Sequence, residues 1–133
     1  MILIDANVFM YAAGAEHPHK QPSVRFLERV AVGEVVAAVD AEVLQEILHR
    51  YRALGRWHDG RRLYDQVRRL VPMVLPIASE VTDRARELLD DDAELTARDA
   101  LHAAAVQVYE AQALVSFDRD FDRLEGVERR QPG

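Results

Sequence analysis

Short runs of consecutive apolar residues alternate along the chain with longer stretches in which apolar residues recur every three or four positions. The short runs predict buried strands, because a strand covered on both faces has no polar side. They cover Ile2–Ile4, Val35–Val39, Met73–Ile77 and Ala113–Ser116, with a weaker candidate at Val127–Arg130. The longer stretches predict helices over Asn7–Ala13, Pro22–Val32, Ala41–Leu54, Trp57–Leu70, Ser79–Leu89 and Ala97–Ala111. Strands that alternate with helices are typical of an α/β fold, with a central parallel sheet flanked by helices on both faces.

Length and composition narrow the class of protein. The chain has 133 residues, of which 49% are hydrophobic, so we expect a single globular domain over residues 1–133. No apolar run approaches the roughly 20 residues that a bilayer span needs, and the first residues lack the pattern of a secretory signal. The absence of cysteine fits a reducing compartment. We therefore expect a cytoplasmic protein without a membrane segment.

The charge of the chain is acidic overall and unevenly distributed. A net charge of −6 argues against a protein that binds nucleic acid through its overall charge. It is compatible with a metal-dependent nuclease, whose acidic cluster is neutralised locally. Basic residues gather between His49 and Arg69, with Tyr51, Trp57 and Tyr64 among them. This segment can hold a polyanion or form a solvated helix face, and its aromatic rings can stack on bases or belong to the core.

Four carboxylates occupy comparable places relative to the predicted elements. Asp5 ends the first apolar run, and Asp118 follows the fourth. Glu46 lies at the margin of the apolar face of its helix, and Asp99 stands in the first turn of the last helix. Ligands of open α/β sheets bind beyond the carboxyl ends of the strands, so we expect the four side chains to converge there. Like charges repel unless a cation offsets them, and Mg²⁺ is the simplest candidate because it prefers oxygen ligands.

Each of these carboxylates also has a purely structural interpretation. Asp5 can cap the helix predicted from Asn7, and Asp118 can cap a short helix through Asp122. Asp99 stands three residues after Thr96, as in a capping box, and Glu46 alone can be an ordinary charge on an amphipathic helix. Their joint placement favours a metal site, because independent caps need not converge on one edge.

Two polar residues accompany the carboxylates. Asn7 and Ser116 can fix carboxylate rotamers or hold metal-bound water, or can serve only the local backbone. His102 can face the pocket from the Asp99 helix, or can be a packed or exposed histidine; the five histidines show no zinc-binding spacing. Residues Asp118–Asp122 imitate the start of a calcium loop, but Arg123 occupies the place that needs glycine, so we reject that site.

The order of these motifs along the chain resembles that of a PIN domain. The motifs are Ile4-Asp5-Ala6-Asn7, Leu44-Gln45-Glu46-Ile47-Leu48, Asp99-Ala100-Leu101-His102-Ala103-Ala104 and Ser116-Phe117-Asp118-Arg119-Asp120-Phe121-Asp122. Over essentially its whole length the sequence is similar to VapC-type toxins of bacterial toxin–antitoxin pairs. The resemblance implies a PIN-like fold and a Mg²⁺- or Mn²⁺-dependent endoribonuclease that cleaves an RNA substrate. It further implies a homodimer inhibited by a small VapB-like antitoxin.

The resemblance also implies roles for individual residues. Asp5, Glu46, Asp99 and Asp118 match the acidic positions of the family, Asp122 is an outlying fifth candidate, and Asn7 and Ser116 match the polar companions. The four main carboxylates would hold the metal and carry catalysis, with Asn7, Ser116 and Asp122 assisting in metal binding. Asp40 stands where the family commonly has a hydroxyl residue, and it can add charge to the site or cap the next helix.

Three rival interpretations share part of this pattern. A haloacid-dehalogenase-like phosphatase needs a second aspartate two positions after the first, where this chain has Asn7. A phosphate-accepting receiver domain needs a lysine beyond a late strand, and the only lysine here is Lys20. A catalytically inactive PIN-like binding module would act by contact alone, and the complete acidic set argues against it because the charge repulsion would gain the module nothing.

Overall fold

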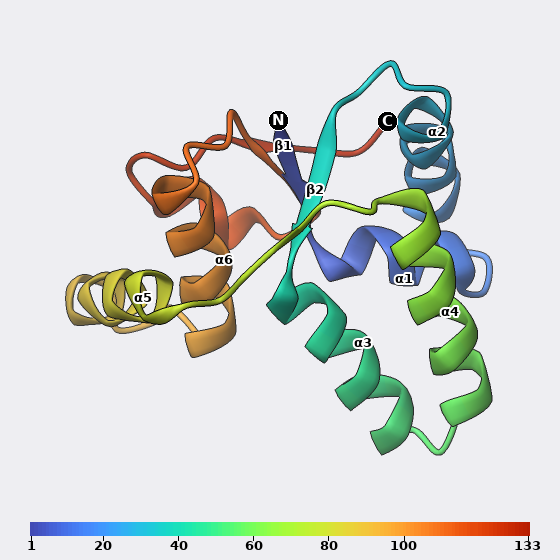
Figure 1. The fold of residues 1–133 in the computed structure, drawn as a ribbon, viewed down its shortest axis with the longest axis horizontal. Helices are drawn as coiled ribbons and strands as arrows, with labels where there is room; N and C mark the ends of the chain where they lie inside the picture. Colours follow the sequence, from blue (N-terminus) through green and yellow to red (C-terminus); the bar gives the residue numbers. More distant parts are fainter.

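The computed structural model describes all 133 residues and contains one five-stranded sheet (Figure 1). The strands are β1 (Ile2–Ile4), β2 (Ala37–Asp40), β3 (Val74–Leu75), β4 (Leu114–Val115) and β5 (Arg129–Arg130). Their order in the sheet is β3-β2-β1-β4-β5, and every neighbouring pair is parallel. The parallel sheet predicted from the alternation of strands and helices is confirmed.

Six α-helices and one short 3₁₀ helix connect the strands. They are α1 (Ala6–Ala13), α2 (Lys20–Ala31), α3 (Ala41–Ala53), α4 (Trp57–Leu70), α5 (Ser79–Asp91), α6 (Ala97–Val108) and the 3₁₀ helix η1 (Arg119–Arg123). Helix α6 ends three residues before its predicted end, because Glu110 adopts a left-handed φ of 54° that closes the helix. Strand β3 is shorter than predicted, since Pro76 has no N–H to continue the ladder. None of the helices has both the length and the apolar composition required to cross a bilayer.

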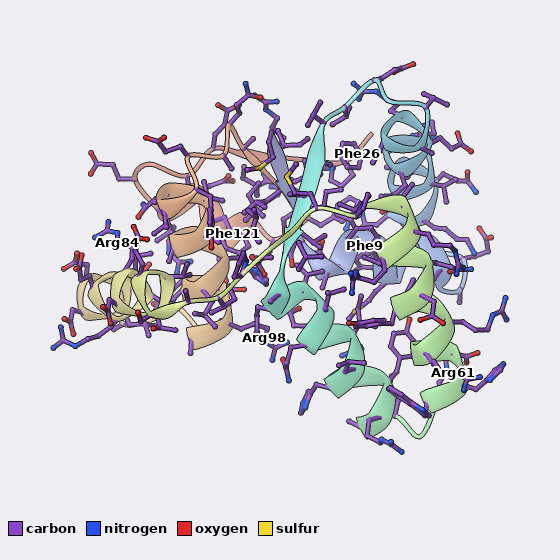
Figure 2. The ribbon with its side chains drawn as sticks, viewed as in Figure 1. Phe9, Phe26, Arg61, Arg84, Arg98 and Phe121 are labelled. Atoms are coloured by element: carbon purple, nitrogen blue, oxygen red, sulfur yellow. The ribbon has the colours of Figure 1, made fainter.

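Helices cover both faces of the sheet. Successive strand residues point to opposite faces, so Ile2 and Ile4 enter one core while Leu3 enters the other. The first core lies under α1 to α4 and contains Phe9, whereas the second lies under α5 and α6 and contains Phe121 (Figure 2). A fully buried side chain of this size contributes about 2 kcal/mol of hydrophobic free energy. The predicted arrangement of helices on both faces is therefore confirmed.

The topology concentrates strand ends beside β1. The chain runs from β1 to β2 and β3 on one side, and then returns through α5 and α6 to β4 on the other side. The strand order thus reverses at β1, and such switch points are where α/β sheets bind ligands. Asp5, Asp40 and Ser116 stand at or just beyond the carboxyl ends of β1, β2 and β4. The fold therefore delivers three polar side chains to one place.

The contact between α3 and α4 depends on a glycine, which gives a test of the packing. A Cβ added to Gly60 would overlap the side chain of Tyr51, reaching 3.0 Å from its Cγ. We expect Gly60→Ala to lower the free energy of unfolding by about 1–3 kcal/mol, because overpacking outweighs the gain of about 1 kcal/mol in helix propensity. Urea unfolding followed by circular dichroism measures the change. Gln66→Ala, at an exposed position of the same helix, should stay within about 0.5 kcal/mol of the native chain; an unchanged midpoint for Gly60→Ala would contradict the close packing.

Candidate functional site

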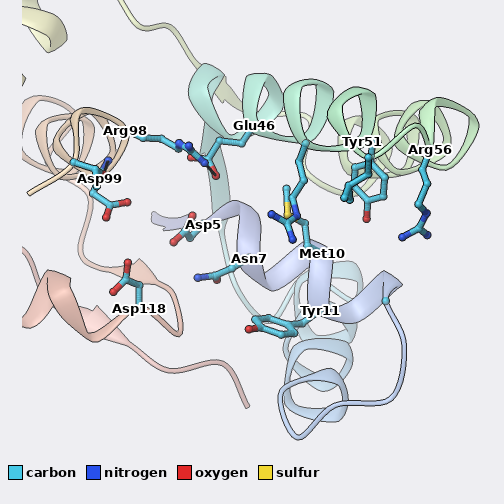
Figure 3. A pocket seen from close by; sticks show the side chains of 14 residues that line it. Asp5, Asn7, Met10, Tyr11, Glu46, Tyr51, Arg56, Arg98, Asp99 and Asp118 are labelled. Atoms are coloured by element: carbon cyan, nitrogen blue, oxygen red, sulfur yellow. Dashed lines mark hydrogen bonds and ion pairs between the residues drawn. The ribbon is translucent and has the colours of Figure 1, made fainter.

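A cavity of about 640 Å³ opens at the carboxyl edge of the sheet. The four carboxylates predicted to converge all line it, together with Asn7 (Figure 3): Asp5, Glu46, Asp99 and Asp118. They come from four different parts of the chain: the β1–α1 junction, α3, the first turn of α6, and the residue before η1. The structure therefore brings together side chains that are far apart in the sequence.

Ser116 fixes the position of Asp5 at the base of this cavity. Asp5 precedes α1 but makes no capping bond to it; its carboxylate is buried and its Oδ2 accepts a hydrogen bond of 2.6 Å from the Ser116 hydroxyl. The same hydroxyl oxygen accepts from the backbone N–H of Asp118 at 3.0 Å and from Asn7 Nδ2 at 3.1 Å. Ser116 thus joins the β1–α1 junction to the segment after β4, and Asp5 serves the cavity rather than the helix end.

Asn7 presents an unpartnered acceptor at the site. The Ser116 hydroxyl donates its hydrogen to Asp5 and so must accept from Asn7, which assigns the amide nitrogen of Asn7 to that contact. The other amide atom, Oδ1, is buried and has no hydrogen-bond partner. Buried oxygen atoms are rarely left without a partner, so this atom is available to a cation or to water held by one.

The capping interpretations of Asp99 and Asp118 hold only in part. The N-cap of α6 is Thr96, whose hydroxyl accepts from the backbone N–H of Asp99 at 3.2 Å, so the Asp99 carboxylate is left to line the cavity. Asp118 does cap η1, because its Oδ1 accepts from the N–H of Asp120 at 2.9 Å. The Asp118 carboxylate also lines the cavity, so capping and a place at the site are compatible.

The electrostatics of the cavity show an excess of negative charge. Burial and the nearby carboxylates of Asp118 and Asp5 raise the pKa of Asp99 to about 6. Burial also raises the pKa of Asp5, and the neighbouring His102 and the hydrogen bond from Ser116 only partly oppose that effect. Carboxylates whose ionisation is disfavoured in this way are common at functional sites, and a divalent cation would favour their charged forms.

His102 lies directly behind the cavity and bridges two carboxylates. It is fully buried, with Nδ1 2.7 Å from Asp40 Oδ2 and Nε2 2.6 Å from Glu46 Oε1. Burial opposes the charged ring, but Asp40, Glu46 and Asp5 outweigh it and raise the pKa of His102 well above its ordinary value. The raised pKa and the two facing carboxylates favour the protonated ring, which donates from both nitrogens. Sequence reasoning allowed His102 either to face the pocket or to be packed, but it missed the contacts with Asp40 and Glu46, which lie 62 and 56 residues away in the chain and leave no signal in local spacing.

His102 supports the site rather than binding a metal itself. Ligand atoms of Asp5, Glu46 and His102 lie within 4.8 Å of one another, which is close enough to share an ion. Both nitrogens of His102 already face carboxylate oxygens and carry protons, so neither has a free lone pair. Its contact instead fixes the Glu46 rotamer, as groups outside the metal shell commonly do.

Asp40 and Asp122, two further acidic residues, have defined roles of their own. Asp40 caps α3, accepting from the N–H of Val43 at 3.1 Å, which is one of its two expected roles; it does not line the cavity, and its other oxygen binds His102. Asp122 does not line the cavity. Its exposed carboxylate pairs with Arg129 at 2.8 Å, and this hydrogen bond holds the pKa of Asp122 below its usual value. The structure thus does not bring the outlying fifth acid to the site.

The donor set fits a hard divalent cation. Four carboxylates and one free amide oxygen surround the cavity, and the chain has no cysteine. Mg²⁺ and Mn²⁺ prefer oxygen ligands, whereas zinc sites are usually built from thiolates and imidazoles. The residues present therefore match an ion of the Mg²⁺ class.

Comparisons with known proteins agree with this geometry. The PIN domain family matches residues 2–127. Ribonuclease VapC13 of Mycobacterium tuberculosis is 43% identical over 97% of this chain and 98% of its own, and Ribonuclease VapC23 of the same species is 35% identical over 89% and 93%. Among solved structures, VapBC2 from Rickettsia felis bound to a promoter DNA fragment has a TM-score of 0.79 at 18% identity, covering 100% of both chains. VapC20 of M. tuberculosis, described as a sarcin–ricin loop cleaving toxin, has a TM-score of 0.75 at 20% identity, covering 96% and 98%. The chain therefore belongs to the PIN domain family, in the branch of the VapC ribonucleases.

The raised pKa of Asp99 predicts that its charge destabilises the metal-free protein. The pKa of this carboxyl is 3.8 in the unfolded chain and about 6 in the folded protein. The protonated carboxyl therefore contributes its full stability to the fold below pH 3.8, and this contribution is lost as the pH rises through 6. In metal-free buffer near neutral pH we expect Asp99→Asn to raise the free energy of unfolding by about 1 kcal/mol, a value that allows for solvent screening of a half-exposed carboxylate.

Thermal unfolding with a chelator at about pH 4 and about pH 7.5 tests this sign. The gain should appear as a Tm higher by about 2–5 °C at the higher pH and should vanish at the lower pH. Asp83→Asn, which neutralises an exposed carboxylate on α5, is the matched control and should leave Tm unchanged. A Tm for Asp99→Asn equal to that of the native chain near neutral pH would contradict the assigned repulsion.

The bridge made by His102 gives a second prediction. Replacing it by alanine leaves Asp40 and Glu46 buried without their cation, so we expect His102→Ala to lower the free energy of unfolding by about 3–5 kcal/mol. Urea unfolding measures the loss, and His58→Ala, at an exposed position of α4, is the control that should cost less than about 0.5 kcal/mol. Equal midpoints for the two variants would show that the bridge contributes nothing to stability.

Proposed function

We propose that this chain is a divalent-metal-dependent endoribonuclease, which hydrolyses phosphodiester bonds of RNA, and that it is the toxin of a toxin–antitoxin pair. One observation carries the proposal: four carboxylates and an unpartnered amide oxygen converge in one cavity of a PIN domain. RNA as the substrate is supported by the relative at 43% identity, which is named a ribonuclease. Residues 1–133 act together as one domain in this proposal.

The chain would bind Mg²⁺ or Mn²⁺ through Asp5, Glu46, Asp99 and Asp118, directly or through water. Once bound, such an ion stabilises charge on the phosphate oxygens and lowers the pKa of the attacking water. Ser116 holds Asp5 in the orientation that faces the cavity, and His102 does the same for Glu46. Asn7 offers its free Oδ1 to the ion or its water. Asp122 is left outside this set because it pairs with Arg129.

The other end of the cavity suits a polyanion. Arg50 and Arg56, both exposed, also line the cavity, and Figure 3 shows Arg56 at the end away from Asp99 and Asp118. Arg98 also lines it, with Nη1 3.9 Å from Glu46 Oε2. Arginines at such positions contact backbone phosphates, so the local charge favours RNA although the chain as a whole carries −6. The basic segment found in the sequence thus contributes two residues directly to the site.

The same geometry separates the nuclease from its rivals. A phosphatase of the rival class would need an aspartate where Asn7 lies, and here that side chain is bound to Ser116. An inactive binding module would retain carboxylates whose ionisation is disfavoured, without the ion that compensates them. Metal-dependent cleavage of phosphodiesters is the activity that uses the four carboxylates and Asn7 together.

Loss of single carboxylates tests the proposed activity. We expect Asp5→Asn and Asp99→Asn each to reduce metal-dependent RNA cleavage by at least about a hundredfold, because each removes a ligand of the ion that stabilises the phosphate. The measurement uses purified protein with Mg²⁺ or Mn²⁺ and a panel of cellular RNAs, with circular dichroism to check folding. Asp83→Asn is the control and should retain cleavage within about twofold.

Two results would overturn this assignment. One is full RNA cleavage by a folded Asp5→Asn or Asp99→Asn variant. The other is hydrolysis of a phosphate monoester such as p-nitrophenyl phosphate by the native chain in the absence of RNA cleavage, which would favour a phosphatase. A native chain that binds the ion but cleaves neither substrate would favour the binding module.

We propose in addition that the chain forms a homodimer in the cytoplasm and is inhibited by a small VapB-like antitoxin. The antitoxin is supported by the VapBC2 structure of Rickettsia felis, and by a Klebsiella pneumoniae neighbour described as a toxin–antitoxin complex with a TM-score of 0.68. Light scattering of the purified chain tests the dimer. Co-expression with the product of an adjacent small gene tests the antitoxin, which should co-purify with the chain and block RNA cleavage.

A further inference from the structure

Four aromatic rings gather beside the same cavity, apart from the carboxylates. Tyr11 comes from α1, His17 and His19 from the segment between α1 and α2, and Phe117 from the segment after β4. The ring of His19 stacks on Phe117 with centroids 3.9 Å apart and an angle of 12°. Tyr11 meets these two rings edge-on at 4.9 and 5.4 Å, and the ring of His17 lies tilted against it at 4.6 Å. The result is one contiguous cluster of rings from three segments of the chain.

Tyr11 is the member of this cluster that faces the cavity. It lines the cavity beside Asn7 and Asp118, whereas the other three rings do not (Figure 3). Tyr11 follows Asn7 by four residues on α1, so the two side chains share one face of the helix, about 6 Å apart along its axis. The ring therefore stands one helical turn from the end of the cavity where the reacting phosphate would bind.

The segment that carries the rings is tethered. Lys20 Nζ donates to the backbone carbonyl of Gly14 at 2.5 Å, which joins the start of α2 to the end of α1. Within the segment, the N–H of His19 donates to Nδ1 of His17 at 3.0 Å. The rings are thus held in place before any ligand arrives, which reduces the entropy lost on stacking.

The aromatic residues of the basic segment do not offer a comparable surface. Tyr51 is 7% exposed and belongs to the core under α3 and α4, and Tyr64 is packed against that core. Trp57 is half-buried and lies under the guanidinium of Arg52, at 4.9 Å. Among the aromatic residues that line the cavity, Tyr11 is half-buried, and neighbouring rings hold it in position.

We propose that Tyr11 is a stacking site for the nucleobase next to the scissile phosphate, with His17, His19 and Phe117 as residues that position its ring. The inference rests on the nuclease function proposed above and adds how the substrate is held. An unpaired base is uncharged, so it can approach the acidic cavity where phosphates are repelled, and any base presents a face to an aromatic ring. The substrate is therefore single-stranded at the cleavage site.

An abasic scan across the cleavage site tests this proposal. The cleavage position is first mapped on a random single-stranded RNA pool, and each nucleotide flanking it is then replaced by an abasic one. For the native chain, we expect the abasic nucleotide at one adjacent position to raise KM about tenfold with kcat within about twofold. Tyr11→Leu should raise KM for the intact RNA by a similar factor and should show no further loss with the abasic RNA.

Matched variants separate stacking from folding. Tyr11→Phe keeps the ring and should retain the abasic effect, and His17→Ala should weaken it about threefold by loosening the ring. His58→Ala, an exposed histidine on α4, should behave as the native chain. A second readout uses RNA that carries the fluorescent base 2-aminopurine at the position identified by the abasic scan. Its fluorescence should fall on binding to the inactive Asp99→Asn variant. It should not fall on binding to the double variant Asp99→Asn, Tyr11→Leu. If Tyr11→Leu does not fold, the proposal is tested by comparing the abasic scan of the native chain with that of His17→Ala.

The outcomes distinguish this inference from the proposed function. A native chain that cleaves no RNA with either metal refutes the nuclease and the stacking site together. A native chain that cleaves RNA with the same KM at every abasic position refutes the stacking site alone. The stacking site is also refuted if the abasic nucleotide raises the KM of Tyr11→Leu by the same factor as it raises the KM of the native chain.

Discussion

Repulsion between buried carboxylates is the constraint on which this site depends. Asp40 and Glu46 are offset from within the protein, because both bind the buried His102 cation. Asp5 and Asp99 make no hydrogen bond to His102, and burial, together with the neighbouring carboxylates, raises their pKa values. The excess negative charge lies at the switch point beside β1, where the ends of several strands meet. The fold tolerates this charge because the strands themselves are buried in two apolar cores that stabilise the rest of the chain. Asp5 and Asp99 therefore face the cavity with their charge only partly compensated, whereas Glu46 lines it with its charge offset by His102.

Most of the fold follows from the pattern of apolar residues. Continuous apolar runs identify β1, β2 and β4, and the period of three to four identifies every helix, with α4 matching its predicted bounds Trp57–Leu70. The apolar pattern does not predict the end of an element when that end is set by a single backbone feature. The left-handed conformation of Glu110 ends α6, and Pro76 ends the pairing of β3, neither of which alters hydrophobic periodicity.

The acidic site could be predicted only in part, because the sequence indicates local placement but not contacts between distant segments. Asp5, Glu46, Asp99 and Asp118 are each placed by the element that carries them, so local spacing and strand order suffice to bring them together. His102 is placed by a contact with Asp40 that spans 62 residues, and its protonation depends on that contact. The aromatic cluster likewise depends on the tertiary approach of three segments. Asp122 looks equivalent to Asp118 in the sequence, but Arg129, seven residues further on, binds it outside the site.

The cavity is divided by charge, and the division suggests how binding and cleavage are linked. At one end, carboxylates repel a phosphate until a divalent ion is present. At the other, Arg50 and Arg56 can attract phosphates, and Tyr11 lines the cavity near Asn7 and Asp118 with its uncharged ring. In the proposed enzyme, RNA can therefore be held by the arginines and the ring without the metal, whereas entry of a phosphate among the carboxylates requires it. Cleavage is then restricted to the one phosphate that the bound base and the ion place together.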